Sequence, residues 1–148
     1  YIIYIEDNLE GTVSEIQMFY TTLLTVDNRK VVIPNGVLSN NSLINVTAQD
    51  KRRLDIDVGI GYSSDLKLAK ELCEKLLEEN DKILREQEHL VVVDSLADSA
   101  VMLKLRFWVR PEDYWPAKWK MTEDVKLLFD RNGIEIPFNQ LDVTIKNR

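Results

Sequence analysis

The stretch VVIPNGVL, residues 31–38, holds both the pattern of a β-strand and the residues that end one. A run of β-branched residues favours a strand, and proline stops it because it has no amide hydrogen to donate to a neighbouring strand. Asparagine and glycine tolerate the backbone conformations of a tight turn. We therefore expect a strand that ends at Ile33 and a corner at Pro34-Asn35-Gly36, where Gly36 takes a positive φ that other residues avoid.

Short runs of the same kind fill the rest of the first 50 residues, and none of them has a helical period. Asp7-Asn8 and Asp27-Asn28 separate these runs, and both residue types are frequent in turns. About four or five strands in such a short segment predict a small all-β sheet or barrel. The expected strands are Tyr1 to Glu6, Thr12 to Tyr20, Thr21 to Val26, Lys30 to Ile33 and Leu43 to Thr47.

The pattern changes after the polar linker at residues 49–53. Leu54 to Ile60 alternates between apolar and polar residues, which predicts a half-buried strand. Ser63 or Ser64 can cap the helix that follows. Its apolar stripe is expected to consist of Leu68, Ala69, Leu72, Cys73 and Leu76.

Two strands, a second helix and a final strand complete the pattern of the second part. The strands are predicted at Leu90 to Leu96 and Val101 to Val109, the helix at Asp113 to Asn132, and the last strand at Leu141 to Ile145. Gly133 suits the left-handed position after a helix. The expected buried face of this helix is Trp115, Trp119, Val125, Leu128 and Phe129. The resulting order β-α-β-β-α-β is ferredoxin-like, so the chain is predicted to be α+β, with domains at residues 1–50 and 51–148.

Composition limits the possible functions. The net charge of −6 disfavours binding to the phosphate backbone of nucleic acids. Cys73 is the single cysteine, so an internal disulfide is excluded. No apolar run approaches the roughly 18 residues of a membrane helix. Because the chain begins with a tyrosine inside an apparent strand, we expect it to be part of a longer protein.

Few residues are candidates for chemistry. His89 is the single histidine and is expected at the surface, whereas Cys73 is expected to pack as a small apolar residue. Asp55 and Asp57 share one strand face and could do acid–base work, but a solvated face explains them better. We therefore expect no catalytic residue, no cofactor and no metal site. Trp108 lies on the polar side of its strand and is either an interface residue or a half-buried surface residue.

A series of short motifs closely resembles the signature of the MscS-type mechanosensitive ion channels. The motifs are Glu10-Gly11-Thr12-Val13, Phe19-Tyr20-Thr21-Thr22-Leu23, Asp27 to Gly36, Asn45-Val46-Thr47, Arg52-Arg53, Gly59 to Asp65, Ile83-Leu84 and Gly133 to Val143. Their order and spacing match over almost all 148 residues. The structural residues of the signature are Gly11, Thr12, Val13, Thr21, Thr22, Pro34, Asn35 and Gly36.

The resemblance implies the cytoplasmic region of a homoheptameric channel in a bacterial or archaeal inner membrane, with its membrane helices before Tyr1. Residues 1–50 would form an Sm-like barrel in a ring beneath the pore, with Val37-Leu38 in a brief helical turn. Residues 51–148 would close a cage through which ions and small solutes pass to relieve osmotic pressure. The last strands would form a small barrel between subunits, so Leu141, Val143 and Ile145 are candidate interface residues, together with Trp108.

Two other classes of function remain as alternatives. A soluble ring-forming module could bind RNA or a small effector, although the acidic charge disfavours RNA. An enzyme is supported only by the acidic pair Asp55 and Asp57. The leading interpretation is a passive part of a channel that associates with copies of itself and binds no nucleic acid.

Overall fold

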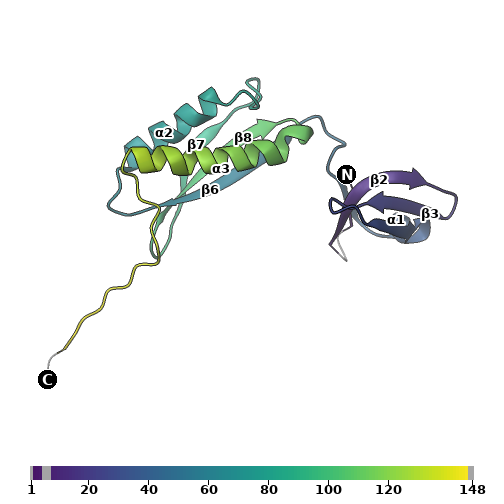
Figure 1. Cartoon of the computed structure of the whole chain (residues 1–148), viewed down its shortest axis with the longest axis horizontal. Helices are drawn as coiled ribbons and strands as arrows, with labels where there is room; N and C mark the ends of the chain where they lie inside the picture. The colour runs from purple at the N-terminus through teal and green to yellow at the C-terminus, as the bar shows by residue number, and fades with distance from the viewer. Residues whose placement is uncertain (1, 5–7, 147–148) are drawn as a thin grey trace. The chain divides into compact units, whose positions relative to one another are not determined.

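The computed structural model describes residues 2–4 and 8–146 of the chain, and it contains two compact units (Figure 1). The small unit is Tyr1–Asp50 and the large unit is Lys51–Arg148.

The small unit is an antiparallel sheet of five strands in the order β4-β3-β2-β1-β5. These strands are β1 (Ile2–Tyr4), β2 (Leu9–Ile16), β3 (Tyr20–Leu24), β4 (Lys30–Pro34) and β5 (Leu43–Asn45), and a short helix α1 (Asn35–Asn40) joins β4 to β5. A bulge at Ser14 shifts the register between β2 and β3. The expected all-β architecture of this region is confirmed, while Tyr1, Ile5 and Glu6 of the first expected strand lie outside the described residues.

The core of the small unit is small and needs a glycine. Among the described side chains of this unit, Leu23 and Ile33 are the large apolar side chains that are buried. A Cβ atom at Gly11 would lie 2.8 Å from the carbonyl oxygen of Leu24 and 3.0 Å from Cβ of Leu23. Glycine is therefore required at position 11 because strands β2 and β3 approach each other closely there.

Asparagines form two turns of the small unit, as expected from their tolerance of the left-handed region. Asn28 has a φ of 64° in the turn between β3 and β4, and Asn8 has a φ of 54° before β2. Its neighbour Asp7 lies outside the described residues.

The expected conformation of Gly36 is wrong. Pro34 ends β4 with a φ of −58° and a ψ of 134°, and α1 then begins at Asn35. Gly36 therefore lies inside the helix, and the glycine with a positive φ among the described residues is Gly133. Proline makes the corner itself, so the chain needs no left-handed residue after it. The expected helical turn at Val37-Leu38 is present within α1.

The large unit consists of a three-stranded antiparallel sheet with two helices on one face (Figure 1). Its elements are β6 (Arg52–Ile60), α2 (Leu66–Glu79), β7 (Leu90–Leu96), β8 (Val101–Val109), a 3₁₀ turn (Pro111–Asp113) and α3 (Tyr114–Arg131). The sheet order is β6-β8-β7. The strands expected at Leu90 to Leu96 and Val101 to Val109 are confirmed at both ends.

Alternation along the strands produces the core of the large unit. In β8 every second residue is buried, from Val101 to Val109, and these side chains face the helices. The helix α2 is capped by Asp65, whose carboxylate accepts a hydrogen bond from the amide of Leu68 at 3.0 Å, so the expected serine cap is wrong. The core is completed by Leu54, Ile56, Val58, Ile60, Ala69, Leu72, Cys73, Leu77, Ile83, Val91, Ala117, Met121, Val125, Phe129 and Ile134.

The expected burial of Trp115 and Trp119 is wrong, because their side chains are 48% and 65% exposed. The buried face of α3 is Ala117, Met121, Val125 and Phe129. Counting back from Phe129 in steps of four reaches Ala117. The two tryptophans stand two positions away from this series, which is about 200° around a helix.

The last expected strand is absent from the sheet. Residues 135–146 contain no helix or strand, so the strand predicted at Leu141 to Ile145 does not pair within this chain. In the described part of the chain the ferredoxin-like order therefore stops after α3, and β6 is an edge of the sheet. Gly133 has a φ of 69° directly after α3, which confirms its expected role.

Candidate functional site

The face of the large sheet that carries no helix holds a network of ion pairs. Asp55 on β6 accepts hydrogen bonds from Arg106 on β8 at 2.9 and 3.1 Å. Lys104 on β8 lies 3.5 Å from Asp57 and 3.3 Å from Asp94. Asp55 and Arg106, and likewise Asp57 and Lys104, are direct neighbours in the antiparallel register of β6 and β8.

These ion pairs shift the pKa values of Asp55 and Lys104. The hydrogen bond from Arg106 lowers the pKa of Asp55, and the charge of Arg53 adds to the effect against partial burial. The hydrogen bond that Lys104 donates to Asp94 raises the pKa of Lys104. The solvated-face interpretation of Asp55 and Asp57 therefore accounts for both residues, since each carboxylate is engaged by a cation and neither is held apart for proton transfer.

The ion pair of Asp55 predicts a pH dependence of stability. A carboxyl group with a lowered pKa in the folded state contributes stability above its unfolded pKa, about 3.9, and loses it as the pH falls through the folded pKa. We expect the free energy of unfolding to fall less steeply below about pH 4 in Asp55→Asn and in Arg106→Gln than in the unaltered chain. Water screens the pair, so the change is small. Chemical unfolding between pH 2 and 6 measures it, and additive effects in the double variant would contradict the coupling.

Trp108 also lies on this helix-free face, at the end of β8. Its side chain is half-buried, and its carbonyl oxygen accepts a hydrogen bond from the amide of Leu84 at 2.9 Å. Arg53 is its partner across the sheet. Its role at an interface stays a prediction.

The corner at Asn35 is the most connected site of the small unit. The Asn35 amide group donates hydrogen bonds to the carbonyl oxygens of Gln17 at 2.8 Å and Met18 at 3.1 Å. Its side-chain oxygen accepts a bond from the hydroxyl of Thr21 at 2.7 Å. Its backbone amide donates to the carbonyl oxygen of Phe19 at 2.8 Å. This one residue therefore ties the β2–β3 turn to the corner after β4, a role that its place in a turn motif did not reveal.

We expect Asn35→Ala to destabilise the small unit by about 1–3 kcal/mol, because the substitution leaves the buried hydroxyl of Thr21 without its partner. Asn40→Ala is the matched control, since Asn40 is an exposed asparagine at the end of the same helix. Hydrogen exchange of the Thr22 and Leu23 amides, compared between the two variants, measures the difference. Equal protection in both variants would show that the Asn35 bonds do not stabilise the turn.

The other residues of the signature lie close to this corner or in the neighbouring strands. Gly11, Thr12 and Val13 belong to β2, and Gly11 is buried. Thr21 and Thr22 are buried in β3, and Pro34 pairs with Tyr20 at the end of β4. The motif thus gathers in one sheet, at the sites where backbone approach or hydrogen bonding restricts the residue type.

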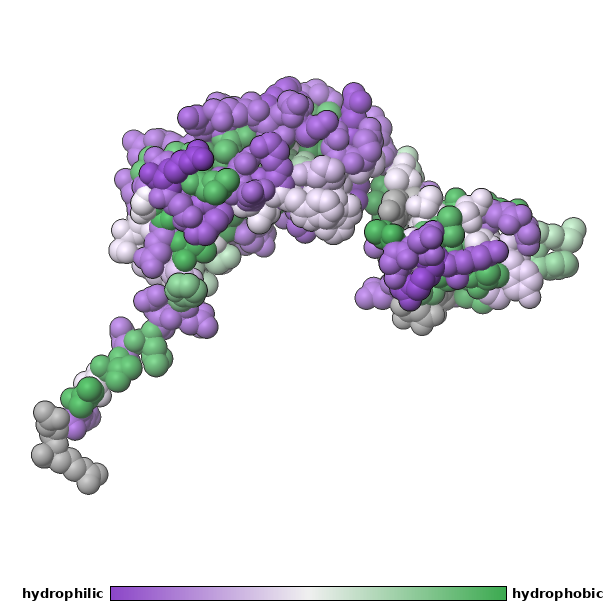
Figure 2. Space-filling model, in the orientation of Figure 1, coloured by the Kyte–Doolittle hydropathy of each residue, from purple (hydrophilic) through white to green (hydrophobic). Residues whose placement is uncertain are grey.

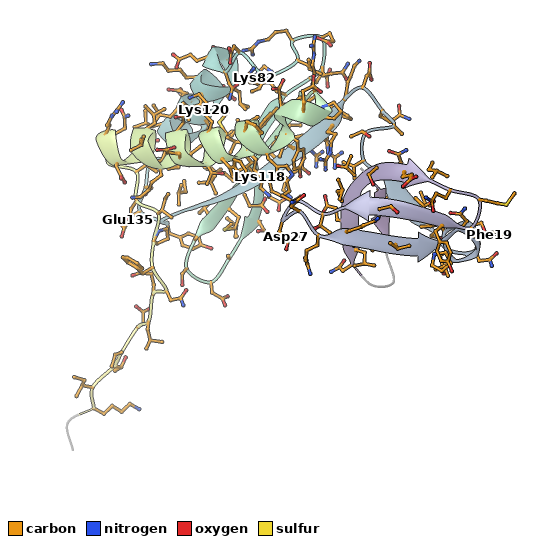
Figure 3. The ribbon with its side chains drawn as sticks, turned by 45° about the vertical axis from the view of Figure 1, so that its right-hand side comes forward. Phe19, Asp27, Lys82, Lys118, Lys120 and Glu135 are labelled. Carbon is orange, nitrogen blue, oxygen red and sulfur yellow. The ribbon has the colours of Figure 1, made fainter. Side chains whose placement is uncertain are left out.

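Much of the apolar surface of the small unit is uncovered. The β2–β3 turn exposes 73% of Ile16, 85% of Met18 and 70% of Phe19. Phe19 projects from one end of the unit, opposite the end that carries Asp27 (Figure 3). Among the side chains that the structure describes in this unit, the other exposed large apolar residues are Tyr20, Leu24, Val26, Val32, Val37, Leu43 and Ile44.

The candidate interface residues of the tail, residues 135–146, are also uncovered. Leu141 is 86% exposed, Val143 is 73% exposed and Ile145 is 83% exposed. The tail extends away from the large unit as an extended segment, and apolar residues are visible along it (Figure 2). These large apolar side chains lie in an extended segment that has no partner strand among the described residues, and their role at an interface stays a prediction.

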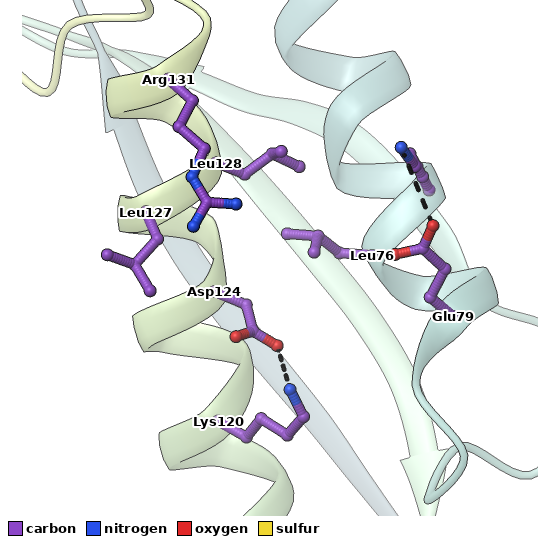
Figure 4. Close-up of a pocket in the computed structure, with 8 residues that line it drawn as sticks. Leu76, Glu79, Lys120, Asp124, Leu127, Leu128 and Arg131 are labelled. Atoms are coloured by element: carbon purple, nitrogen blue, oxygen red, sulfur yellow. Dashed lines mark hydrogen bonds and ion pairs between the residues drawn. The ribbon is translucent and has the colours of Figure 1, made fainter.

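The large unit has a groove of about 340 Å³ between α2 and α3 (Figure 4). Leu76 and Leu128 line it. Four charged residues of its lining form ion pairs within a helix, Lys120 with Asp124 at 2.5 Å and Lys75 with Glu79 at 3.8 Å.

The remaining candidates for chemistry are Cys73 and His89. Cys73 is buried, and burial raises the pKa of its thiol to about 12. His89 is half-buried in a loop. Among the described residues no group of three or more His, Cys, Asp or Glu could hold a metal ion.

In the described part of the chain, no helix combines the length and the apolar character that crossing a bilayer requires. The large unit is an α/β module with two helices on one side of its sheet, and the small unit is a five-stranded β module. Both units expose large apolar side chains, and together they place the chain in the class of two-module α+β proteins.

Comparison with known proteins agrees with this class. Residues 2–48 match the family model described as "Mechanosensitive ion channel, beta-domain", and residues 54–136 match "Mechanosensitive ion channel MscS, C-terminal". The small-conductance mechanosensitive channel of Edwardsiella ictaluri is 36% identical over 133 residues, which are 90% of this chain and 46% of that protein. The chain belongs to the MscS family of mechanosensitive ion channels, which is not a class of enzymes.

Solved structures support the same relationship. The closed-state crystal structure of Helicobacter pylori MscS matches with a TM-score of 0.91 and 32% identity, covering 99% of this chain and 58% of that chain. A cryo-EM structure of Arabidopsis thaliana MSL1 shares the fold, with a TM-score of 0.74 at 16% identity, over 93% of this chain and 51% of that chain. The chain thus spans about half the length of the relatives that it matches.

Proposed function

We propose that the chain is the cytoplasmic part of a mechanosensitive channel that releases osmotic pressure, and that seven copies assemble beneath the pore. In this role the small units form a ring, and the large units enclose a vestibule through which ions and small solutes pass. The domain boundary at residue 50, the cytoplasmic face of a bacterial or archaeal membrane and membrane helices before Tyr1 belong to the same proposal.

The observation that supports assembly is the uncovered apolar surface of the small unit. A unit of about 50 residues buries too little of its own surface to be strongly stable. Here Ile16, Met18 and Phe19 are more than two-thirds exposed. Burying such side chains against a neighbouring copy contributes roughly 1.5–3 kcal/mol for each residue. Head-to-tail contacts between identical copies form a ring when the rotation between them closes, and such a ring would complete the core of every copy.

The helix-free face of the large sheet is the surface that we assign to the solute path. A path for ions needs a hydrated wall, and this face carries the charged residues Asp55, Asp57 and Lys104 beside apolar residues such as Trp108 and Val92. Its carboxylates are paired with cations, so we expect it to discriminate weakly between cations and anions. The chain contributes passively, while the tension-sensing step belongs to the membrane part.

A chimaeric channel tests the proposal. The chain replaces the matched region of the Edwardsiella ictaluri channel, and the chimaera is expressed in bacteria that lack their own mechanosensitive channels. We expect survival of an osmotic downshock, tension-activated currents in patches and a particle with seven copies. A chimaera that reaches the membrane as monomers and carries no current would contradict the proposal. For the isolated chain, light scattering measures whether the mass approaches about seven times 17.2 kDa.

A further inference from the structure

Two loops meet at one end of the large sheet. The first connects β6 to α2 and includes residues 61–65, and the second is the β7–β8 hairpin turn at residues 97–100. The Tyr62 hydroxyl donates a hydrogen bond to the carbonyl oxygen of Ala97, which joins the two loops. Each loop is also closed internally, by the bond from the Ser64 amide to Gly61 O at 3.0 Å and from the Ala97 amide to Ala100 O at 2.8 Å.

Both loops hold the tail. The Gly61 amide donates to the carbonyl oxygen of Glu135 at 2.9 Å, and the Glu135 amide donates to the hydroxyl oxygen of Ser64 at 3.3 Å. Further along, the Gln140 amide donates to the hydroxyl oxygen of Ser99 at 3.0 Å. Because all three contacts are made to backbone atoms of the tail, they hold the main chain itself and depend little on the tail side chains.

The course of the tail follows from these contacts. Ile134 is buried in the core, so the tail starts at a fixed point after α3. It then runs past the β7–β8 hairpin before it leaves the large unit (Figure 1). The last contact lies at Gln140, directly before the exposed residues Leu141, Val143 and Ile145.

We propose that Ser64 and Ser99 are positioning residues for assembly, which aim the tail so that residues 141–146 of neighbouring copies can pair. This inference rests on the proposed function. With both serine contacts made, the free segment begins after Gln140; without them the Gly61 amide still binds the carbonyl oxygen of Glu135, so the free segment begins after Glu135. Its described length then rises from about six to about eleven residues, and the volume that a flexible segment explores rises by about 2.5-fold. For seven tails these factors multiply to roughly several hundredfold in the assembly constant, since an ordered segment loses less freedom on binding.

The test compares the variant Ser64→Ala/Ser99→Ala with the control Ser63→Ala/Ser95→Ala, which removes two neighbouring hydroxyls that form no hydrogen bond with the described residues of the tail. Hydrogen exchange of the Glu135 and Gln140 amides is measured in the full chain, and mass is measured against concentration. We expect at least tenfold faster exchange of both amides and assembly at clearly higher concentration in the test variant, with the thermal midpoint of the large unit unchanged. Ser99→Thr, which keeps the hydroxyl, should restore slow exchange at Gln140.

Each other outcome overturns the inference. Unchanged exchange would show that the serines do not hold the tail, and faster exchange with unchanged assembly would show that holding the tail does not aim it. Failure of the proposed function would give a different experimental result, because the unaltered chain and the chimaera would then both remain monomeric. In that case the exchange comparison still decides whether the two serines fix the tail.

Discussion

Gly11→Ala is expected to disrupt the small unit, whereas Gly36→Ala is expected to leave it intact. The added Cβ at position 11 would meet the carbonyl oxygen of Leu24 at 2.8 Å, a backbone atom that cannot move without distorting β3. Overpacking of this kind typically costs about 1–3 kcal/mol, and more where the backbone must shift. A 50-residue unit has a total stability of only about 2.5–7.5 kcal/mol, so the substitution removes a large share of it.

The Gly36 variant is a sharp control because both glycines belong to the same signature. A Cβ at Gly36 meets no atom within 4 Å, and Gly36 lies in α1, where alanine favours the helix by up to about 1 kcal/mol. The amides of Thr22 and Leu23 report on the unit through hydrogen exchange, whereas all three tryptophans report on the large unit. Equal protection of these amides in both variants would contradict the close approach of β2 and β3.

Replacing Leu141, Val143 and Ile145 together by aspartate is expected to abolish assembly without unfolding either unit. These side chains are largely exposed in the single chain, so their loss costs the folded monomer little. In an assembly each would bury apolar surface that contributes roughly 1.5–3 kcal/mol, which the three substitutions remove in every copy. The expected result is a fall in mass to that of the monomer, with an unchanged helical circular dichroism signal.

Charge alone does not explain this expected loss, and a second variant separates the two causes. Thr144→Asp/Lys146→Asp changes the net charge by the same −3 but leaves the three apolar residues in place. We expect this control to assemble, more weakly at low salt because like charges repel. Monomeric behaviour of both variants at high salt would show that the alternating apolar residues do not carry the contact.

Parts of the structure were predictable because their sequence pattern is local. The alternation from Val101 to Val109 predicts a strand and its buried face, and the structure has both. The short β-rich runs of the first 50 residues likewise predict an all-β unit. In these segments the period of the apolar residues and the geometry of the element coincide over enough residues to leave little choice.

Other features could not be predicted because they depend on packing between segments. Trp115 and Trp119 have helical spacing, but spacing does not determine which face of α3 meets the sheet. The partners of Asp55 depend on the register of β6 against β8, which sets Asp55 opposite Arg106. The sequence does show oppositely charged residues on the polar sides of β6 and β8. Without the register between the two strands, however, it does not show which of these residues pair with each other.

The residues of the family signature likewise divide into features that follow from local sequence patterns and features that depend on tertiary contacts. The sequence by itself determined the all-β character of the first unit, the two long helices and the strands of the second unit, and the family, because each rests on residue types at short and fixed spacing. Only the tertiary structure decided that Gly11 rather than Gly36 is the sterically restricted glycine, that Asn35 ties two turns together, and that Leu141 to Ile145 find no partner strand within the chain. Close approach, hydrogen bonding between distant segments and strand pairing depend on distances through space, and local sequence patterns do not contain those distances.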